Sequence, residues 1–326
     1  MKILIIKLSS LGDLFHALPA VHNLKVELNT KIDWVVNKKY VDVVKCFTDV
    51  DNVIPFYRNA FFANFKPFLK ELRAQEYDYI IDLQGLMKSA IVGKLARGSK
   101  LIGPSFHREC AHLFYSGVAG KCDKNRHAVE ENLDIVRYLG LNLMEPEFHA
   151  AFPKKNLSEK HPRVAILPVS RWHTKNWHVK NFIDVAGYLQ GKKNISIFIL
   201  GSPEDVEICK GIETALNGDV INMAGKTSLV DMAGILNEMD LLIANDSGPT
   251  HMAAAVGTPV LAVFGPTDPA RTGPYGSRHR IAEISLPCRP CFSKTCGRGN
   301  IQCMAGVTAE QVEKTALEMI QHFNNC

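Results

Sequence analysis

Two α/β domains, each built around a parallel, doubly wound sheet, are the fold class that this sequence predicts. Short apolar runs rich in Ile and Val alternate with segments of helical periodicity along most of the chain, and such alternation builds parallel sheets covered by helices. A length of 326 residues exceeds one ordinary core and fits two. A polar stretch with three prolines at residues 142–162 predicts a linker, and we place the domains at residues 1–155 and 156–326.

The first half of the chain predicts four strands and four helices. The strands are the apolar runs at residues 2–7, 32–36, 52–56 and 77–83. Helical periodicity marks residues 14–28, 39–47 and 62–75, and a further helix at residues 85–98 is expected to end at Gly98.

The second half repeats this alternation. Its expected strands are residues 163–167, 196–200, 241–246 and 259–265, and its expected helices are residues 179–190, 203–216, 229–239 and 249–257. The chain then closes with an amphipathic helix at residues 308–323, for which we predict Thr308 as the N-cap and Glu310 in the first turn. Packing of this last helix on the N-terminal domain is left open.

Composition and charge are those of an ordinary globular protein. The apolar fraction is 46%, the charged fraction is 22% and the formal net charge is +5. A lysine inside the first apolar run argues against a signal peptide, and no window approaches the roughly 18 uncharged apolar residues that a membrane span requires. We therefore expect a cytoplasmic protein whose membrane contact is peripheral, and no nucleic-acid partner.

Basic residues are concentrated in the first half of the chain. Such a single-sign patch raises the local concentration of anionic substrates, although solvated helix faces explain any one of these residues equally well. The cluster consists of Lys66, Lys70, Arg73, Lys88, Lys94, Arg97, Lys100, Arg108, Lys121, Lys124 and Arg126.

Four of the nine cysteines lie in the segment "CRPCFSKTCGRGNIQC". The C-x2-C-x4-C-x6-C spacing of Cys288, Cys291, Cys296 and Cys303 permits zinc but is not that of a standard finger or ribbon. Thiols are the usual state of cysteines in a cytosolic chain. We therefore expect free thiols, no structural zinc and no cofactor.

The segment "KLSSLGDLFHALPA" at residues 7–20 places a carboxylate where the first strand turns into a helix. Ligands of open parallel sheets bind outside the carboxyl ends of the strands. Two interpretations of Asp13 stay open here: it caps the helix, since Asp is among the best N-cap residues, or it is a catalytic base at the mouth of the sheet.

A second candidate site follows the strand at residues 241–246. Its loop "NDSGPTH" leads into a helix, with Pro249 expected in the first turn, and a helix N-terminus of this kind is suited to phosphate oxygens. "VFGPTDP" at residues 263–269 adds a third polar loop. The chain has neither a Walker loop nor G-x-G-x-x-G, so kinases and classical dehydrogenases are not supported.

Three further residues allow two interpretations each. Lys175 is either a surface lysine or a point charge on a diphosphate. Glu204 is either an acid in the first turn of a helix or an acceptor for ribose hydroxyls, and His251 is either a packed helix residue or part of the phosphate loop.

Four stretches together resemble glycosyltransferase family 9, and the resemblance runs essentially from end to end. They are "KLSSLGDLFHALPA", "IDLQGLMKSA", "RHAVEENLDIVRYLG" and "NDSGPTHMAAAVGTPVLAVFGPTDPARTGPYG". The resemblance implies the GT-B architecture, in which two Rossmann-like domains face each other across a cleft. It also implies an acceptor in the N-terminal domain, ADP-heptose in the C-terminal domain, and metal-independent transfer with inversion at the anomeric carbon.

The resemblance further implies roles for single residues. Asp13 matches the family's catalytic base, and Lys175 matches the lysine that contacts the diphosphate. The other donor positions are Ser170, Arg171, Glu204, Asp246, Ser247, Gly248, Thr250 and His251. The acceptor positions are Ser10, Gly12, Arg58, Lys88 and Arg108.

Within the family, the chain most resembles members that move heptose onto Kdo of Kdo-lipid A, at the cytoplasmic face of the inner membrane. The segment at residues 286–304 departs from those members and is similar to others in the family. A transferase acting on a later core sugar is therefore one alternative. A non-catalytic nucleotide-binding module is another.

Overall fold

The computed structural model describes residues 1–157, 161–192, 195–216 and 220–324. The chain divides into two compact units, Met1–Ala151 and Phe152–Cys326. The boundary lies four residues before the predicted one and inside the stretch expected to be a linker, of which residues 158–160 are outside the described residues.

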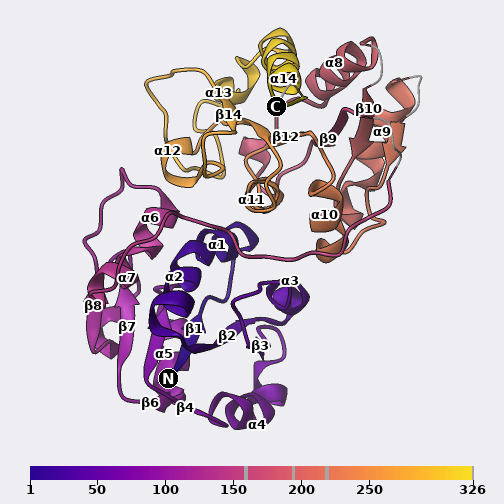
Figure 1. Ribbon diagram of the computed structural model, residues 1–326. Coiled ribbons are helices and arrows are strands. Elements are labelled where there is room, and N and C mark those ends of the chain that lie inside the picture. The colour runs from indigo at the N-terminus through magenta and orange to yellow at the C-terminus, as the bar shows by residue number, and fades with distance from the viewer. Residues whose placement is uncertain (158–160, 193–194, 217–219, 325–326) are drawn as a thin grey trace. The chain divides into compact units, whose positions relative to one another are not determined.

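The first unit is built on a six-stranded sheet in which all paired strands are parallel, in the order β3-β2-β1-β5-β7-β8 (Figure 1). This is the doubly wound order, in which the chain moves outward from the centre first in one direction and then in the other. Its strands are β1 (Lys2–Ile6), β2 (Lys31–Asn37), β3 (Asn52–Phe56), β5 (Tyr79–Asp82), β7 (Leu101–Pro104) and β8 (Gly117–Ala119).

Both faces of this sheet are buried, as a continuous apolar strand such as "KILII" requires. Leu4 and Ile6 of β1 belong to the core under α4 and α5, while Ile3 and Ile5 point to the opposite face. The helices of the unit are α1 (Leu11–His16), α2 (Leu18–Leu28), α3 (Val41–Val44), α4 (Phe61–Leu72), α5 (Met87–Leu95), α6 (Ala128–Asn132) and α7 (Asp134–Tyr138).

The helix predicted at residues 85–98 ends three residues early, and its glycine has another role. The helix expected to close at Gly98 stops at Leu95 because Ala96 is already extended, and Arg97–Gly98 form strand β6, which pairs with β4 (Glu76–Tyr77). A Cβ atom on Gly98 would lie 2.5 Å from the Tyr77 carbonyl oxygen. This glycine therefore permits the close approach of two strands and does not terminate a helix.

The second unit repeats the same strand order, β11-β10-β9-β12-β13-β14, again with all pairs parallel (Figure 1). The strands are β9 (Arg163–Leu167), β10 (Ser196–Ile199), β11 (Val220–Asn222), β12 (Leu241–Asn245), β13 (Val260–Val263) and β14 (Arg280–Ala282). The helices are α8 (Val179–Gln190), α9 (Val206–Ala215), α10 (Leu229–Leu236), α11 (Gly248–Ala255), α12 (Pro269–Thr272), α13 (Gln302–Ala305) and α14 (Ala309–Asn324).

The last helix, α14, packs within its own unit. Its residues Val312, Ala316 and Met319 join the buried core formed with α8, α9 and the sheet. The predicted N-cap is confirmed, because the Gln311 amide donates to the Thr308 hydroxyl oxygen at 3.2 Å. Packing of this helix on the N-terminal domain stays a prediction. Among the described residues, no helix combines the length and apolarity that crossing a bilayer would take.

Helix α4 offers a matched pair of phenylalanines for a test of the core. Phe68 is 2% exposed and its ring meets Phe56 edge-on at 5.6 Å, whereas Phe62 on the same helix is 94% exposed. We expect Phe68→Ala to lower the free energy of unfolding by about 3–5 kcal/mol and Phe62→Ala to change it by less than about 0.5 kcal/mol. Urea unfolding of both variants measures this, and equal losses would contradict the packing of α4.

Candidate active site

In the second unit, Asn245 joins the loops that follow β9 and β12. This residue ends β12 and is fully buried. Its side-chain amide donates to the Pro168 carbonyl oxygen at 2.6 Å, and its Oδ1 accepts from the Trp177 amide at 3.0 Å. The strand order reverses between β9 and β12, and at such a point open α/β sheets bind their ligands.

A buried carboxylate lies beside this junction. Asp246 Oδ2 is 2.6 Å from Lys175 Nζ and accepts a hydrogen bond from the Thr267 hydroxyl, also at 2.6 Å. The side chain of Asp246 is 4% exposed and that of Lys175 is 16% exposed, so each charge depends on the other for stabilisation. The Trp172 ring covers the lysine, with Nζ 4.7 Å from its centroid. The ammonium group is thereby fixed where three loops meet.

Helix α11 begins directly after this carboxylate. Ser247 is its N-cap residue and Pro249 stands in the first turn, as predicted. Thr250 is fully buried, and its hydroxyl donates to the Asn245 carbonyl oxygen at 2.9 Å and lies 3.2 Å from the Ser247 hydroxyl. The threonine side chain thus holds the start of the helix, and Gly248 forms its first residue.

The remaining predicted donor residues differ in their surroundings. Ser170 is buried, and its hydroxyl donates to the Asp246 carbonyl oxygen at 2.9 Å. Arg171, next to it, is exposed, and so is Glu204 in the turn that follows β10. The structure therefore gathers Ser170, Lys175 and Asp246, and places Glu204 at the end of the neighbouring strand.

His251 and His279 belong to the same part of the second unit. His251, on α11, is 8% exposed. His279 accepts from the Val260 amide at Nδ1, 3.2 Å away, and lies 3.1 Å from the Tyr275 carbonyl oxygen at Nε2. Burial lowers the pKa of His279 to about 4, and the nearby charges of Arg278 and His251 act in the same direction. The ring is therefore neutral at pH 7.

The four cysteines of residues 288–303 are free thiols in a segment that packs on the loop of Lys175. The Thr174 hydroxyl donates to the Ser293 carbonyl oxygen at 2.8 Å, and the Phe292 amide donates to the Pro266 carbonyl oxygen at 2.8 Å. Lys294 lies over the Trp172 ring at 5.2 Å. This segment thus supports the loops around Lys175, and the absence of zinc from its cysteines stays a prediction.

In the first unit, Asp13 stands at position N3 of α1, so it is not itself the N-cap residue. Its Oδ2 accepts from both the amide and the hydroxyl of Ser10, each at 2.7 Å, in a capping-box arrangement. Ser10 is exposed, Asp13 is half-buried and Gly12 is buried. The carboxylate is thus held by one oxygen in the turn after β1.

A lysine that the sequence interpretation missed lies at the end of β1. Lys7 is 5% exposed and donates to the Leu83 carbonyl oxygen. Burial lowers its pKa, while the charges of Asp13, Asp82 and Glu131 oppose that shift. Asp82, at the end of β5, is fully buried, and burial raises its pKa.

Asp82 is held by a complete set of donors. It accepts from the hydroxyls of Tyr115 at 2.7 Å and Ser89 at 2.8 Å, and from the amides of Gln84 and Gly85 at 2.8 and 3.1 Å. Because all these donors come from the segments that follow β5 and β7, the carboxylate organises this edge of the sheet.

The three predicted acceptor cations are all exposed and follow strand ends of one sheet. Arg58 comes after β3, Lys88 lies in the first turn of α5, and Arg108 comes after β7. The Arg108 amide donates to the Gly85 carbonyl oxygen at 2.8 Å, and its charge acts on Lys7. Among the interactions described, no contact joins the three cations to one another.

Four site residues escaped the sequence interpretation: Lys7, Trp172, Asn245 and Thr267. In the sequence, Lys7 is the polar last residue of the first apolar run. Asn245 lies inside the run at residues 241–246, which predicts a strand. The loop of Thr267 carries a recognisable signal, because it is polar and follows a strand. Nothing local indicates that its hydroxyl binds a carboxylate 21 residues away in the sequence.

Residues 66–302 match glycosyltransferase family 9 (heptosyltransferase). The chain belongs to this family. A family relative, lipopolysaccharide heptosyltransferase 1 of Pseudomonas aeruginosa, is 29% identical over 316 residues, which cover 91% of this chain and 87% of the relative.

Solved structures agree with the family assignment. The Escherichia coli heptosyltransferase WaaC with ADP superposes with a TM-score of 0.82 at 26% identity, covering 98% of this chain and 100% of that one. The same enzyme with ADP-2-deoxy-2-fluoro heptose gives a TM-score of 0.79 at 27% identity, with 98% and 99% covered. The predicted GT-B fold class of two Rossmann-like units is thereby confirmed.

His279 gives this family member a pH-dependent stability. Its pKa is about 4 in the native state against an ordinary value of 6.5, so between these values the unfolded chain binds a proton that the native chain does not. Stability is therefore expected to fall as the pH falls from about 7 to about 4, by roughly 2–3 kcal/mol from this group. Urea unfolding across this range measures the loss.

In His279→Gln, this part of the pH dependence should disappear. Replacement of the exposed His173 by Gln is the control for the loss of an imidazole. If His279→Gln and the wild type lose equal stability on acidification, the lowered pKa assigned to the half-buried His279 is wrong.

Proposed function

We propose that this protein is a heptosyltransferase of lipopolysaccharide core synthesis that moves heptose from ADP-heptose to Kdo of Kdo-lipid A. The proposal rests on the family membership, on the similarity to lipopolysaccharide heptosyltransferase 1 of Pseudomonas aeruginosa and of Escherichia coli, and on the likeness to a heptosyltransferase solved with ADP. The catalytic role rests on the position of the Asp13 carboxylate in the turn after β1, because an inverting transfer needs one base at the acceptor hydroxyl.

The donor would bind the second unit. A diphosphate needs positive charge and N–H donors, and the Lys175 ammonium group and the start of α11 both follow strands at the switch point. Asp246 keeps the lysine in place, so that the charge is positioned before the ligand arrives. Arg171 and Glu204 are exposed at the same edge of the sheet, where we assign them to the phosphates and the ribose.

The reaction would then need one proton transfer. Asp13 Oδ1 takes the proton of the acceptor hydroxyl, whose oxygen attacks the anomeric carbon, and the bond from that carbon to the ADP oxygen breaks on the opposite face. The configuration at the anomeric carbon is thereby inverted. The negative charge that develops on ADP is met by Lys175, so the step requires no metal.

The acceptor is assigned to the first unit. Kdo and the phosphates of lipid A are anionic, and Arg58, Lys88 and Arg108 are exposed cations at the carboxyl edge of the sheet. Ser10 and Gly12 lie in the turn that carries the base. A lipid acceptor also implies peripheral attachment at the cytoplasmic face of the inner membrane.

Turnover with defined acceptors tests the proposed step. ADP release from ADP-heptose is expected with Kdo-lipid A and not with an acceptor that already carries the first heptose. Release only with the heptosylated acceptor would assign the protein to a later core sugar. Donor binding without release on either acceptor would favour the non-catalytic alternative.

Lys175→Ala should weaken ADP binding by about tenfold or more, because a charge-assisted contact contributes roughly 1.5–3 kcal/mol. Lys180→Ala removes a lysine whose partner, Asp184, lies on the surface and should bind ADP as the wild type does. Titration calorimetry compares the three proteins. An unchanged Kd for Lys175→Ala would contradict its role at the diphosphate.

Asp13→Asn should retain the fold and ADP affinity but lower kcat by at least about 100-fold, because the amide can still accept from Ser10 but cannot take a proton. Asp231 is a matched control, since its Oδ2 also accepts from the amide and hydroxyl of a serine three residues before it. Asp231→Asn should turn over normally. If the two variants have equal kcat values, Asp13 is only a capping residue.

A further inference from the structure

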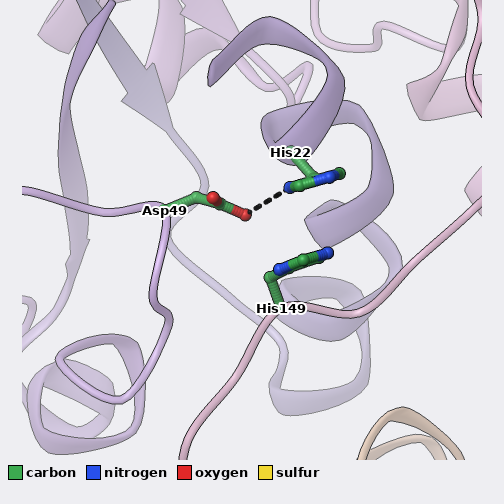
Figure 2. Close-up of side chains that lie close together, drawn as sticks. All are labelled: His22, Asp49 and His149. Atoms are coloured by element: carbon green, nitrogen blue, oxygen red, sulfur yellow. Dashed lines mark hydrogen bonds and ion pairs between the residues drawn. The ribbon is translucent and has the colours of Figure 1, made fainter. Parts of the chain in front are cut away.

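A cluster of possible metal ligands in the first unit has no part in the proposed reaction. It consists of His22 on α2, Asp49 in the turn before β3, and His149 near the end of the unit (Figure 2). One ligand atom from each residue lies within 4.8 Å of the other two. His22 and Asp49 are each 8% exposed, so two of the three residues are largely withdrawn from water.

The distance between His22 and Asp49 suits a tetrahedral ion. His22 Nδ1 is 3.1 Å from Asp49 Oδ2, and two ligand atoms at about 2.0–2.2 Å from one tetrahedral ion lie about 3.3 Å apart. In Figure 2 the imidazole rings lie one above the other, each with a nitrogen on the side of Asp49. An ion at this point would replace the proton that the imidazole and the carboxylate share.

His149 brings its own supporting carboxylate. Its Nε2 is 2.8 Å from Glu147 Oε2, which leaves Nδ1 as the atom for an ion. A carboxylate on the far nitrogen of a ligating imidazole fixes its tautomer and raises its basicity, as is usual around zinc. The rings of His22 and His149 are nearly parallel, 5° apart and 3.6 Å between centroids. Joint ligation therefore requires the His149 ring, about a third of whose side chain is exposed, to rotate.

The backbone already holds the three segments together. The Thr48 amide donates to the His149 carbonyl oxygen at 3.0 Å, the Ala151 amide donates to the Cys46 carbonyl oxygen at 2.8 Å, and Phe47 forms an antiparallel bridge with Ala150. The Met144 amide donates to Asn23 Oδ1 on α2 at 2.8 Å. Since these contacts are independent of the three side chains, the ligands are brought near one another before an ion binds.

We propose that His22, Asp49 and His149 form a structural site for a divalent transition ion of the zinc class. Two imidazoles and one carboxylate are the ligands that Zn²⁺ accepts, and water can supply the fourth position. The ion fastens residues 144–151, the last segment of the first unit, to α2 and to the turn before β3. The site is independent of the transfer reaction proposed above.

Titration of the full chain with Co²⁺ tests the site. The protein also carries free thiols, but cobalt bound to thiolate gives an intense near-ultraviolet charge-transfer band, whereas nitrogen and oxygen ligands give weak visible bands only. We expect one equivalent to bind with weak visible bands alone, and Zn²⁺ to displace it. Binding with the thiolate band alone, or no binding, would overturn the proposal.

Variants separate this site from other histidines. His22→Asn and His149→Asn should each weaken Co²⁺ binding by more than about 100-fold, and Glu147→Gln by about 10–100-fold. His161→Asn is the control, because His161 forms a similar pair with Asp240, at 2.8 Å, outside the three-residue cluster. Equal binding by the wild type and both ligand variants would refute the site. The melting temperature of His22→Asn, measured without metal ion, checks that this variant folds. His149 is more exposed, so His149→Asn gives a second variant that perturbs the core less.

Discussion

A buried carboxylate requires partners, and the second unit depends on the partners of Asp246. One of them, Lys175, comes from the loop after β9, and the other, Thr267, comes from the loop after β13. Separation of these loops would leave a charge without compensation in a dry environment, which costs several kcal/mol. The same contact therefore stabilises the unit and positions the ammonium group that we assign to the diphosphate.

The first unit places the same residue types at the corresponding strand ends but satisfies them with other partners. Its strand order is that of the second unit, so β1 and β5 correspond to β9 and β12. In each unit a lysine follows the first of these strands and a buried aspartate stands at the end of the second: Lys7 and Asp82, and Lys175 and Asp246. The carboxyl ends of parallel strands at the switch point form a polar edge on an apolar sheet. Asp246 pairs with Lys175 at this edge. In the first unit, Lys7 donates to the Leu83 carbonyl oxygen and Asp82 accepts from hydroxyls and amides.

Sequence patterns predicted the sheets better than the contacts at their edges. The strands at the centre of each sheet are apolar runs such as "KILII" and "RVAIL", and burial on both faces makes such runs easy to recognise. The edge strands β8, β11 and β14 have three residues each and β7 has four, too few for a periodic pattern, and the sequence interpretation missed these four strands of the two sheets. The contacts of Thr267 and Asn245 depend on loops that only the folded sheet brings together.

Asp13 shows why local structure alone does not assign a function. Three serines, Ser10, Ser202 and Ser228, each donate through amide and hydroxyl to an aspartate three residues later. The cap interpretation and the base interpretation are therefore compatible, since capping occupies one carboxylate oxygen and leaves the other. What distinguishes Asp13 is its place after β1, a central strand, near the buried Lys7, whose pKa its charge raises. The capping contacts hold the carboxylate in one orientation before the acceptor binds. A general base fixed in this way loses less rotational entropy in the transition state, which lowers the barrier to proton transfer.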